Sequence, residues 1–254
     1  MKTKRMVVLG TGMMVLLGGL IVAGANFWKS TLVVRNVQIH GNRVVAANEI
    51  LQLAHITEGA RLYELDLMQI QQDVLSHYFL KDVVVERDPP SGVRITVTER
   101  TPVAMINVGE IRYIDAEGVV LPHALSGELY DLPYISGIPP GVRANIGTTL
   151  THPDIREALA IIATAQVVGP EVPHLFSEIR LRAGGDLVLY AAEGAVPIIF
   201  GRGNAGSKLL VLDVFWKNVV RERGPGSVQY IDIRFADQVV VKWKQGGTKS
   251  SKRS

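Results

Sequence analysis

The 254-residue chain contains no cysteine. This absence excludes disulfide bonds, zinc sites built from thiolates and catalysis by a thiol nucleophile. It does not exclude export from the cytoplasm, because a chain of this length can bury a core large enough to fold without covalent bridges.

Catalytic and metal-binding motifs are also missing. The sequence has no H-E-x-x-H pair, no G-x-S-x-G elbow and no G-x-x-x-x-G-K-[ST] loop. The six histidines are scattered, without the spacing of metal ligands: His40, His55, His77, His123, His152 and His174. We therefore expect a protein that is not an enzyme and that uses no cofactor and no metal.

Excess positive charge is confined to the two ends of the chain. The formal net charge is +3, and eight cations lie at the ends: Lys2, Lys4, Arg5, Lys242, Lys244, Lys249, Lys252 and Arg253. Removing these eight from the 27 Lys and Arg leaves 19, against 24 Asp and Glu. The folded part is thus mildly acidic, which argues against nucleic-acid binding, and residues 245–254 are expected to form a disordered basic tail.

One long apolar run stands near the start of the chain. Residues 6–27 carry no charge, and a helix of this length spans ~33 Å, enough to cross a hydrocarbon core of ~30 Å. Residues 1–5 hold three cations and no acid, which predicts a cytoplasmic tail and places everything after the run outside the cytoplasm. We predict a transmembrane helix at residues 6–28, with Phe27 and Trp28 at the far interface.

A cleavable signal peptide is the alternative for this segment. Ala23-Gly24-Ala25 fits an A-x-A cleavage site after a basic start and an apolar run. The run is longer than the ~7–15 residues usual for the apolar region of a signal peptide, which favours a retained anchor. Both interpretations export the rest of the chain.

The next 70 residues alternate between strand and helix patterns. We predict a strand at 32–40, helices at 46–56 and 66–79, with Asp66 as the second N-cap, and a hairpin. In the hairpin, Val83 and Val85 face one side with Val93, Ile95 and Val97, and residues 88–92 form the turn. This order predicts a small α+β unit in which two helices cover one face of a three-stranded sheet.

These segments resemble a POTRA domain. The likeness rests on five stretches: Arg35-Asn36-Val37-Gln38-Ile39-His40-Gly41-Asn42, Glu49-Ile50, Gly59-Ala60-Arg61-Leu62, Val83-Val84-Val85-Glu86-Arg87-Asp88-Pro89-Pro90 and Ile95-Thr96-Val97-Thr98-Glu99-Arg100. Thr101-Pro102-Val103-Ala104 is similar to the joint that follows this domain in the FtsQ/DivIB family of bacterial division proteins. One POTRA domain directly after an N-terminal anchor is the arrangement of that family.

The second half of the chain is rich in strands. Predicted strands lie at 103–108, 111–115, 119–121, 132–136, 176–182, 186–192, 196–200, 228–235 and 239–243, and predicted helices at 153–168 and 207–221. Pro197 cannot donate to a ladder, so its strand should lie at a sheet edge or begin at a bulge.

This half is similar to the β-domain of the same family. The likeness rests on Tyr113-Ile114-Asp115, Ser177-Glu178-Ile179-Arg180-Leu181, Phe200-Gly201 and Tyr230-Ile231-Asp232-Ile233-Arg234-Phe235. The resemblance implies an α+β protein with a single transmembrane helix, a β-α-α-β-β POTRA domain at 32–101 and a mostly antiparallel β-domain with two helices at 102–244.

A glycine-rich string lies between a predicted strand and a predicted helix. Residues 201–206 read G-x-G-x-x-G, the pattern of a dinucleotide-binding loop. Such a site also needs a parallel strand ending in an acid ~20 residues later, and that distance falls on the end of the predicted helix at Glu222. A connecting turn is the favoured interpretation, and a dinucleotide-binding enzyme is the alternative.

The last predicted hairpin is the candidate site. Val239-Val240-Val241 strongly favours a strand, which could leave one row of backbone groups open to a partner strand. Equally, the valines could pack inside while the lysines after them protect the edge. The resemblance implies a partner-binding site made of Tyr230, Arg234, Phe235, Val239, Val240, Val241, Lys242 and Trp243.

The family resemblance also implies the function. It predicts a bitopic scaffold of the division machinery in the cell (inner) membrane, on the periplasmic side at the septum, which binds FtsB/DivIC-like and FtsL-like bitopic proteins. The POTRA domain would contact further division proteins, and the whole would recruit and regulate septal peptidoglycan synthesis. The rival is another exported POTRA protein of outer-membrane assembly or secretion, which repeated POTRA units or a barrel pattern would favour.

Overall fold

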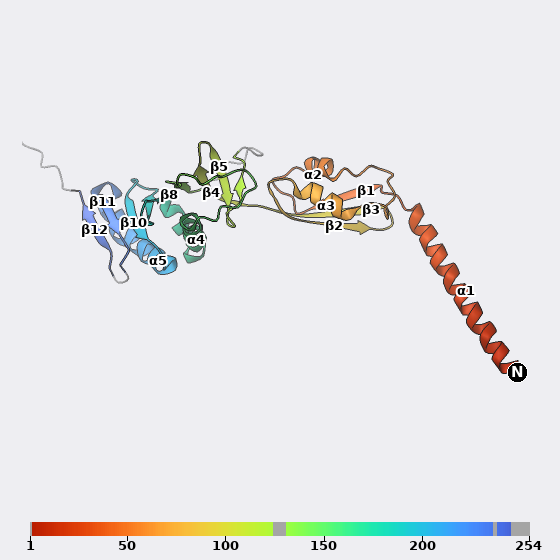
Figure 1. Cartoon of the computed structure of the whole chain (residues 1–254). Helices are drawn as coiled ribbons and strands as arrows, with labels where there is room; N and C mark the ends of the chain where they lie inside the picture. The colour runs from red at the N-terminus through yellow and green to blue at the C-terminus, as the bar shows by residue number, and fades with distance from the viewer. Residues whose placement is uncertain (1, 124–130, 236–237, 245–254) are drawn as a thin grey trace, which may run out of the picture. The chain divides into compact units, whose positions relative to one another are not determined.

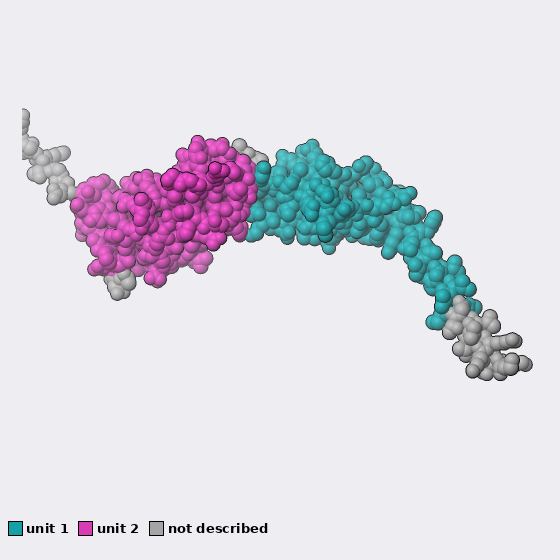
Figure 2. Space-filling view, in the orientation of Figure 1, with its two compact units in different colours: residues 1–100 teal, residues 101–254 magenta. Residues whose placement is uncertain are grey.

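The computed structural model describes residues 2–123, 131–235 and 238–244, with side chains from residue 13 onward. The chain divides into two compact units, Met1–Arg100 (unit 1) and Thr101–Ser254 (unit 2), coloured separately in Figure 2.

Unit 1 begins with a single long helix, α1, at Lys2–Thr31 (Figure 1). Its segment Met13–Thr31 has a mean hydropathy of 1.3, and none of it is buried against the rest of the protein. A helix this long and apolar is able to cross a membrane. The predicted apolar helix is therefore present, and its helical backbone continues to Thr31.

The rest of unit 1 follows the predicted order of elements. They are β1 at Asn36–His40, α2 at Ala47–Ala54, α3 at Leu67–Leu75, β2 at Leu80–Asp88 and β3 at Gly92–Glu99. The sheet order is β1-β3-β2, with β1 parallel and β2 antiparallel to the central strand. Ile50 and Val74 from the helices pack in the core with Val83 and Ile95 from the sheet, and all four are fully buried. This confirms the α+β unit with both helices on one face (Figure 1).

The two helices begin by different means. Asp66 caps α3 as predicted, accepting hydrogen bonds from the N–H groups of Met68 and Gln69 at 3.1 Å. Ala46 gives α2 no side-chain cap. Instead, the Glu99 carboxylate at the end of β3 accepts the N–H groups of the residues just before α2, at 2.8 Å from Val45. A contact between distant parts of the sequence thus organises the start of α2.

Two predicted boundaries in unit 1 are wrong. The first strand begins at Asn36 rather than at residue 32, because the preceding backbone pairs with a loop: Val34 N–H donates to the Ala60 carbonyl at 2.9 Å. Helix α3 ends at Leu75 rather than at residue 79, where the Ser76 hydroxyl bonds back to the Asp73 carbonyl. Tyr78, which falls inside the predicted helix, lies beyond the observed one and is 52% exposed.

Unit 2 is built on one nine-stranded sheet. Its strands are β4 at Pro102–Asn107, β5 at Ile111–Asp115, β6 at Val120–Leu121, β7 at Tyr134–Ser136, β8 at Phe176–Leu181, β9 at Leu187–Ala191, β10 at Pro197–Gly201, β11 at Val228–Asp232 and β12 at Val240–Trp243. Their order is β12-β11-β10-β9-β8-β7-β4-β5-β6. Five neighbouring pairs are antiparallel and three are parallel, which agrees with the predicted mostly antiparallel domain.

Two helical stretches cover the core of unit 2. The first is α4 at Pro153–Val168. The second starts as α5 at Ala205–Phe215 and continues through a π-helical turn at Trp216–Val220 into α6 at Arg221–Arg223. Short 3₁₀ turns lie at Val172–Leu175 and Pro225–Ser227. Trp216 and Val220 are both buried, so the π turn carries anchoring side chains into the core.

The strand that contains Pro197 is not at a sheet edge. Strand β10 pairs with β9 on one side and with β11 on the other, so the edge prediction is wrong. Pro197 is the first residue of β10 and pairs opposite Tyr190, whereas pairing with β11 begins only at Ile198. The bulge of this strand falls at its other end, between Ile199 and Gly201. A proline at the first position of a strand removes no hydrogen bond that the neighbouring ladder needs.

Candidate partner-binding site

The site lies where the parallel strands β10 and β11 end and helix α5 begins. The chain leaves β10 through the glycine-rich residues 201–206, runs back along α5 and returns in β11, parallel to β10. The carboxyl ends of parallel strands next to a helix start are a common location for binding sites. The parallel pairing of β10 and β11 is not predicted by the sequence pattern.

The first glycine of this string is required by its neighbours. Gly201 has φ +69°, a conformation that L side chains rarely adopt. A Cβ atom at this position would lie 2.8 Å from Cγ of Arg234, whose side chain crosses over the glycine. Two residues on, the Gly203 N–H donates to the Glu157 carboxylate of α4 at 2.7 Å.

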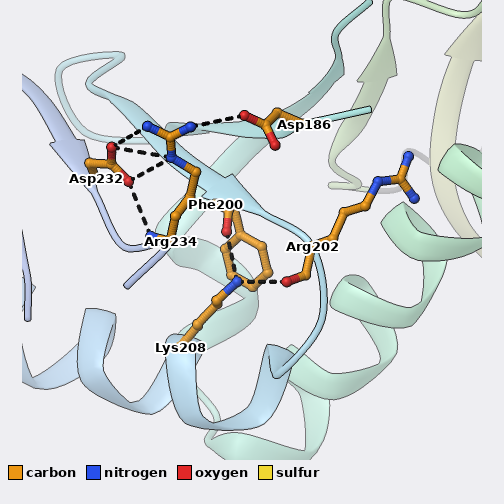
Figure 3. A network of polar contacts seen from close by, with 6 residues as sticks. All are labelled: Asp186, Phe200, Arg202, Lys208, Asp232 and Arg234. Atoms are coloured by element: carbon orange, nitrogen blue, oxygen red, sulfur yellow. Dashed lines mark hydrogen bonds and ion pairs between the residues drawn. The ribbon is translucent and has the colours of Figure 1, made fainter. Parts of the chain in front are cut away.

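The inside of the glycine-rich turn is occupied by a lysine (Figure 3). The Lys208 ammonium donates to the carbonyls of Phe200 at 3.0 Å and Arg202 at 2.8 Å, and lies 5.1 Å from the centre of the Phe200 ring. Partial burial lowers the pKa of Lys208 below its ordinary value. The carbonyls of Phe200 and Arg202 are therefore satisfied by a side chain of the protein itself, which favours a structural strand-to-helix connection.

An acidic residue does stand at the end of the parallel strand, at Asp232 rather than near Glu222. Asp232 is 6% exposed, and its carboxylate is held by Arg234, with Nη2 2.7 Å from Oδ2 and Nε 3.1 Å from Oδ1 (Figure 3). Arg234 Nη1 also donates to Asp186 at 3.1 Å, beside the start of β9. The hydrogen bonds from Arg234 lower the pKa of Asp232 and raise that of the guanidinium.

This network joins the ends of β9, β10 and β11. The Arg234 side chain spans from Asp232 to Asp186 across Gly201, yet 42% of it stays exposed to solvent. A cation fixed in position by two carboxylates and still open on one side can take part in recognition.

Strand β12 closes the sheet at its end next to β11. Within residues 2–123, 131–235 and 238–244, β11 is its only strand neighbour. The Lys244 N–H donates to the Ser227 carbonyl at 2.7 Å, toward β11. Backbone N–H and C=O groups point to opposite sides of a strand at successive residues. Those of Val241 and Trp243 therefore point away from β11.

The side chains of the hairpin divide between its two faces. Val239, Val241 and Trp243 are half-buried against the core, and the Arg223 guanidinium lies 4.7 Å from the centre of the Trp243 ring. Tyr230 is half-buried and opposite the exposed Lys242. Val240 is 39% and Phe235 49% exposed. Alternate side chains thus pack inside, and no strand among the described residues pairs with the outer side of β12. Residues 236 and 237 of the predicted turn at 236–238 lie outside the described residues.

Two hollows adjoin this hairpin. A cleft of about 630 Å³ is lined by Arg202, Lys208, Arg234, Phe235 and Val239 among others. An almost wholly apolar groove of about 440 Å³ runs along α5 and the π turn, past Leu210, Val214 and Asn218, and reaches Val239. Leu210 is 55% and Val214 52% exposed.

The apolar groove is not predicted by any of the motifs in the sequence. Its signal was present in residues 209–215, where apolar side chains surround the helix instead of forming one stripe. Leu209 and Leu212 are fully buried, whereas Leu210, Val211 and Val214 on the outer face of α5 stay exposed.

Comparisons with known proteins agree with this architecture. Residues 32–100 match the POTRA domain, FtsQ-type, and residues 104–234 match the family described as cell division protein FtsQ/DivIB, C-terminal. The chain is 30% identical over 206 residues to the cell division protein FtsQ of a Geobacter species, which covers 81% of this chain and 74% of the relative. It is 30% identical over 222 residues to the FtsQ of Rhodothermus marinus, covering 85% and 79%. A cell division protein DivIB of Clostridium acetobutylicum is 26% identical over 89 residues, or 35% of this chain and 36% of the relative.

Proposed function

Since the chain belongs to the FtsQ/DivIB family of cell division proteins, we propose that it is a non-enzymatic scaffold of the division machinery. In this role it binds FtsB- or DivIC-type and FtsL-type bitopic proteins and helps to recruit and regulate septal peptidoglycan synthesis. Helix α1 anchors it in the cell membrane, with residues 1–5 in the cytoplasm and the domains at 32–101 and 102–244 on the outer side, at the septum. The basic start of the apolar helix supports this orientation.

The observation that carries the proposal is the outer edge of β12, which pairs with no other strand among the described residues. A partner strand would pair with the outward backbone groups of Val241 and Trp243. Each such hydrogen bond contributes only about 0.5–1.5 kcal/mol, so apolar contacts must supply much of the affinity. The groove beside Val239 and the exposed ring of Phe235 provide apolar surface directly next to that edge.

Charge around the hairpin favours an acidic partner segment. Arg234 is positioned by Asp232 and Asp186 with part of its guanidinium exposed, and Lys242 is exposed on β12. An acidic side chain that flanks the partner's strand could reach Arg234, while the apolar side chains of the strand fill the groove. These contacts would set the register of the added strand.

The test is a proline at the outward-facing position, Val241→Pro. The substitution removes a donor that the fold itself does not use, because that N–H points away from β11. We expect capture of an FtsB-like partner from solubilised membranes to fall at least about tenfold, the effect of ~1.4 kcal/mol, with little change in thermal unfolding.

The matched control is Val240→Pro, one residue earlier. The N–H of Val240 faces β11, so this variant should loosen the hairpin and lower the unfolding temperature of unit 2. Undiminished partner capture by a folded Val241→Pro protein would refute strand addition at β12.

A further inference from the structure

Unit 1 has no free linker between its membrane helix and its folded part. Helix α1 ends at Thr31, and residues 32–36 form a strap that is hydrogen-bonded along its length. The Leu62 N–H donates to the Leu32 carbonyl at 2.8 Å, Val34 donates to Ala60 at 2.9 Å, and Arg35 donates to Ser91 at 2.9 Å. The loop at 59–62 is therefore held directly beside the end of the anchor.

The anchor length places this loop at the depth of the lipid headgroups. Leu32 follows Trp28 by one helical turn, about 6 Å of rise. The polar layer on each side of the hydrocarbon core is itself about 5–7 Å thick. With Trp28 at the boundary of the core, the pairing between Leu32 and Leu62 falls within or just above the headgroups of the leaflet where α1 ends.

The side chains at this end suit such a layer. Two cations lie near the Tyr63 ring, with Lys29 Nζ and Arg87 Cζ each 5.5 Å from its centre. Arg87 is held in place because it donates to the carbonyls of Leu62 at 2.9 Å and Leu65 at 2.8 Å. Tyrosine rings with nearby cations are typical of the membrane interface.

Arg61 is an exposed cation at this end. Its ion pair with Glu64 spans 2.8 Å, but the two side chains are 58% and 66% exposed. Surface pairs of this kind contribute little, so the guanidinium is available to a phosphate that offers bidentate hydrogen bonds. Lys29 and Arg35 add two further cations, against the acids Glu58 and Glu64.

We propose that Lys29, Arg35, Arg61 and Tyr63 form a binding surface for anionic phospholipid headgroups in the leaflet where α1 ends. Contact with lipid at this surface holds unit 1 upright on the membrane. The inference depends on the membrane anchoring proposed above and concerns a surface separate from the β12 hairpin.

The absence of native cysteine allows a direct test on the full chain in lipid nanodiscs. A single spin label is placed at Thr57→Cys, beside the strap, or at Arg43→Cys as the matched control. Arg43 lies beyond the far end of β1, a strand that spans about 17 Å at ~3.3 Å per residue. Relaxation of the label by a nickel-chelating headgroup lipid reports its distance from the headgroups. We expect strong relaxation at position 57 and weak relaxation at position 43.

The charge contribution is tested by Arg61→Glu in the Thr57→Cys background. We call a protein docked when its label at position 57 is relaxed by the headgroup lipid. In phosphatidylglycerol discs, Arg61→Glu should lower the ratio of docked to undocked protein at least about fivefold, the effect of ~1 kcal/mol per basic residue. In phosphatidylcholine discs, the two proteins should behave alike. Equal relaxation at positions 57 and 43, or docking that ignores lipid charge, would overturn the proposal. Carbonate extraction distinguishes failure of the membrane anchor from failure of the headgroup-binding surface. A chain that carbonate extracts from the membrane contradicts the anchor. A chain that stays inserted but makes no headgroup contact contradicts only the binding surface.

Discussion

Strands β2 in unit 1 and β12 in unit 2 are both edge strands, but they present different side chains. Strand β2 exposes Lys81, Asp82 and Glu86, charges of both signs, beside a single exposed valine, Val84. Strand β12 exposes Val240 and one charge, Lys242, and adjoins the apolar groove along α5. Charged side chains protect an edge against pairing, and an apolar edge beside a groove invites it. The comparison indicates which of these two edges is suited to a partner strand.

The largest expected effect is the selective unfolding of unit 1, which would show that the two units are stable independently of each other. Gly41 has φ +86°, and a Cβ atom there would lie 2.1 Å from the Val97 backbone carbonyl, which has no freedom to move. We expect Gly41→Ala to destabilise unit 1 by about 4 kcal/mol or more. Hydrogen exchange of the full chain should then show lost protection in β1 and β3.

The matched control for Gly41→Ala is Gly59→Ala, where φ is +83° but no atom lies within 4 Å of the new Cβ. It should cost only about 1–2 kcal/mol of backbone strain. Protection of β11 and β12 that is lost together with β1 would contradict two separately stable units.

The next effect is a loss of stability in the network of Asp232, Arg234 and Asp186 beside the β12 hairpin. Replacing Asp232 by Asn removes a buried carboxylate that holds Arg234, and hydrogen bonds to charged groups contribute about 1.5–3 kcal/mol each. Because Arg234 lowers the pKa of Asp232 below its ordinary 3.8, the carboxylate stabilises the fold fully above that value. This stability is lost as pH falls through the lower, folded-state pKa.

Chemical denaturation between pH 2 and pH 7 measures this effect. The wild-type protein should lose stability in unit 2 below about pH 4, and Asp232→Asn should flatten that part of the curve. An unchanged slope in the variant would exclude Asp232 as a source of acid sensitivity.

A smaller effect is expected from substitutions that compare the edge strands β12 and β2 directly. Val240 on β12 is 39% exposed and Val84 on β2 is 46% exposed, which makes them a matched pair. Val240→Lys should weaken partner capture roughly five- to thirtyfold, about 1–2 kcal/mol, because it places a charge beside an apolar contact. Val84→Lys should leave capture unchanged, and calorimetric titration of both variants with the partner provides the measurement. Equal losses would mean that the two edges do not differ as inferred.

An effect of similar size, on stability alone, is expected at the glycine-rich turn. Lys208→Met leaves the carbonyls of Phe200 and Arg202 without their donor and should lower the stability of unit 2 by about 1–2 kcal/mol. Titration of the wild-type chain with NAD should give no saturable heat. Micromolar binding of NAD would revive the dinucleotide interpretation of residues 201–206.

Much of the fold follows from local patterns in the sequence. The apolar run specifies α1 because a charge-free segment of that length has one stable arrangement in a bilayer. The change between helical and two-residue periodicity specifies the elements of unit 1, and Asp66 specifies the start of α3 because its carboxylate can reach the next N–H groups. The errors lie at element ends, where contacts with distant residues decide: Leu32 and Val34 pair with the loop at 59–62 rather than with the sheet.

Tertiary structure alone decided the site. Period-two alternation identifies a strand but not its neighbours in the sheet. Local sequence therefore does not show that β10 and β11 are parallel, that β10 with Pro197 lies inside the sheet, or that β12 lies at its end. The requirement for glycine at 201 comes from the Arg234 side chain, 33 positions later in the chain. Pairing energies between distant segments settle strand order, and strand order determines which backbone groups remain available to a partner.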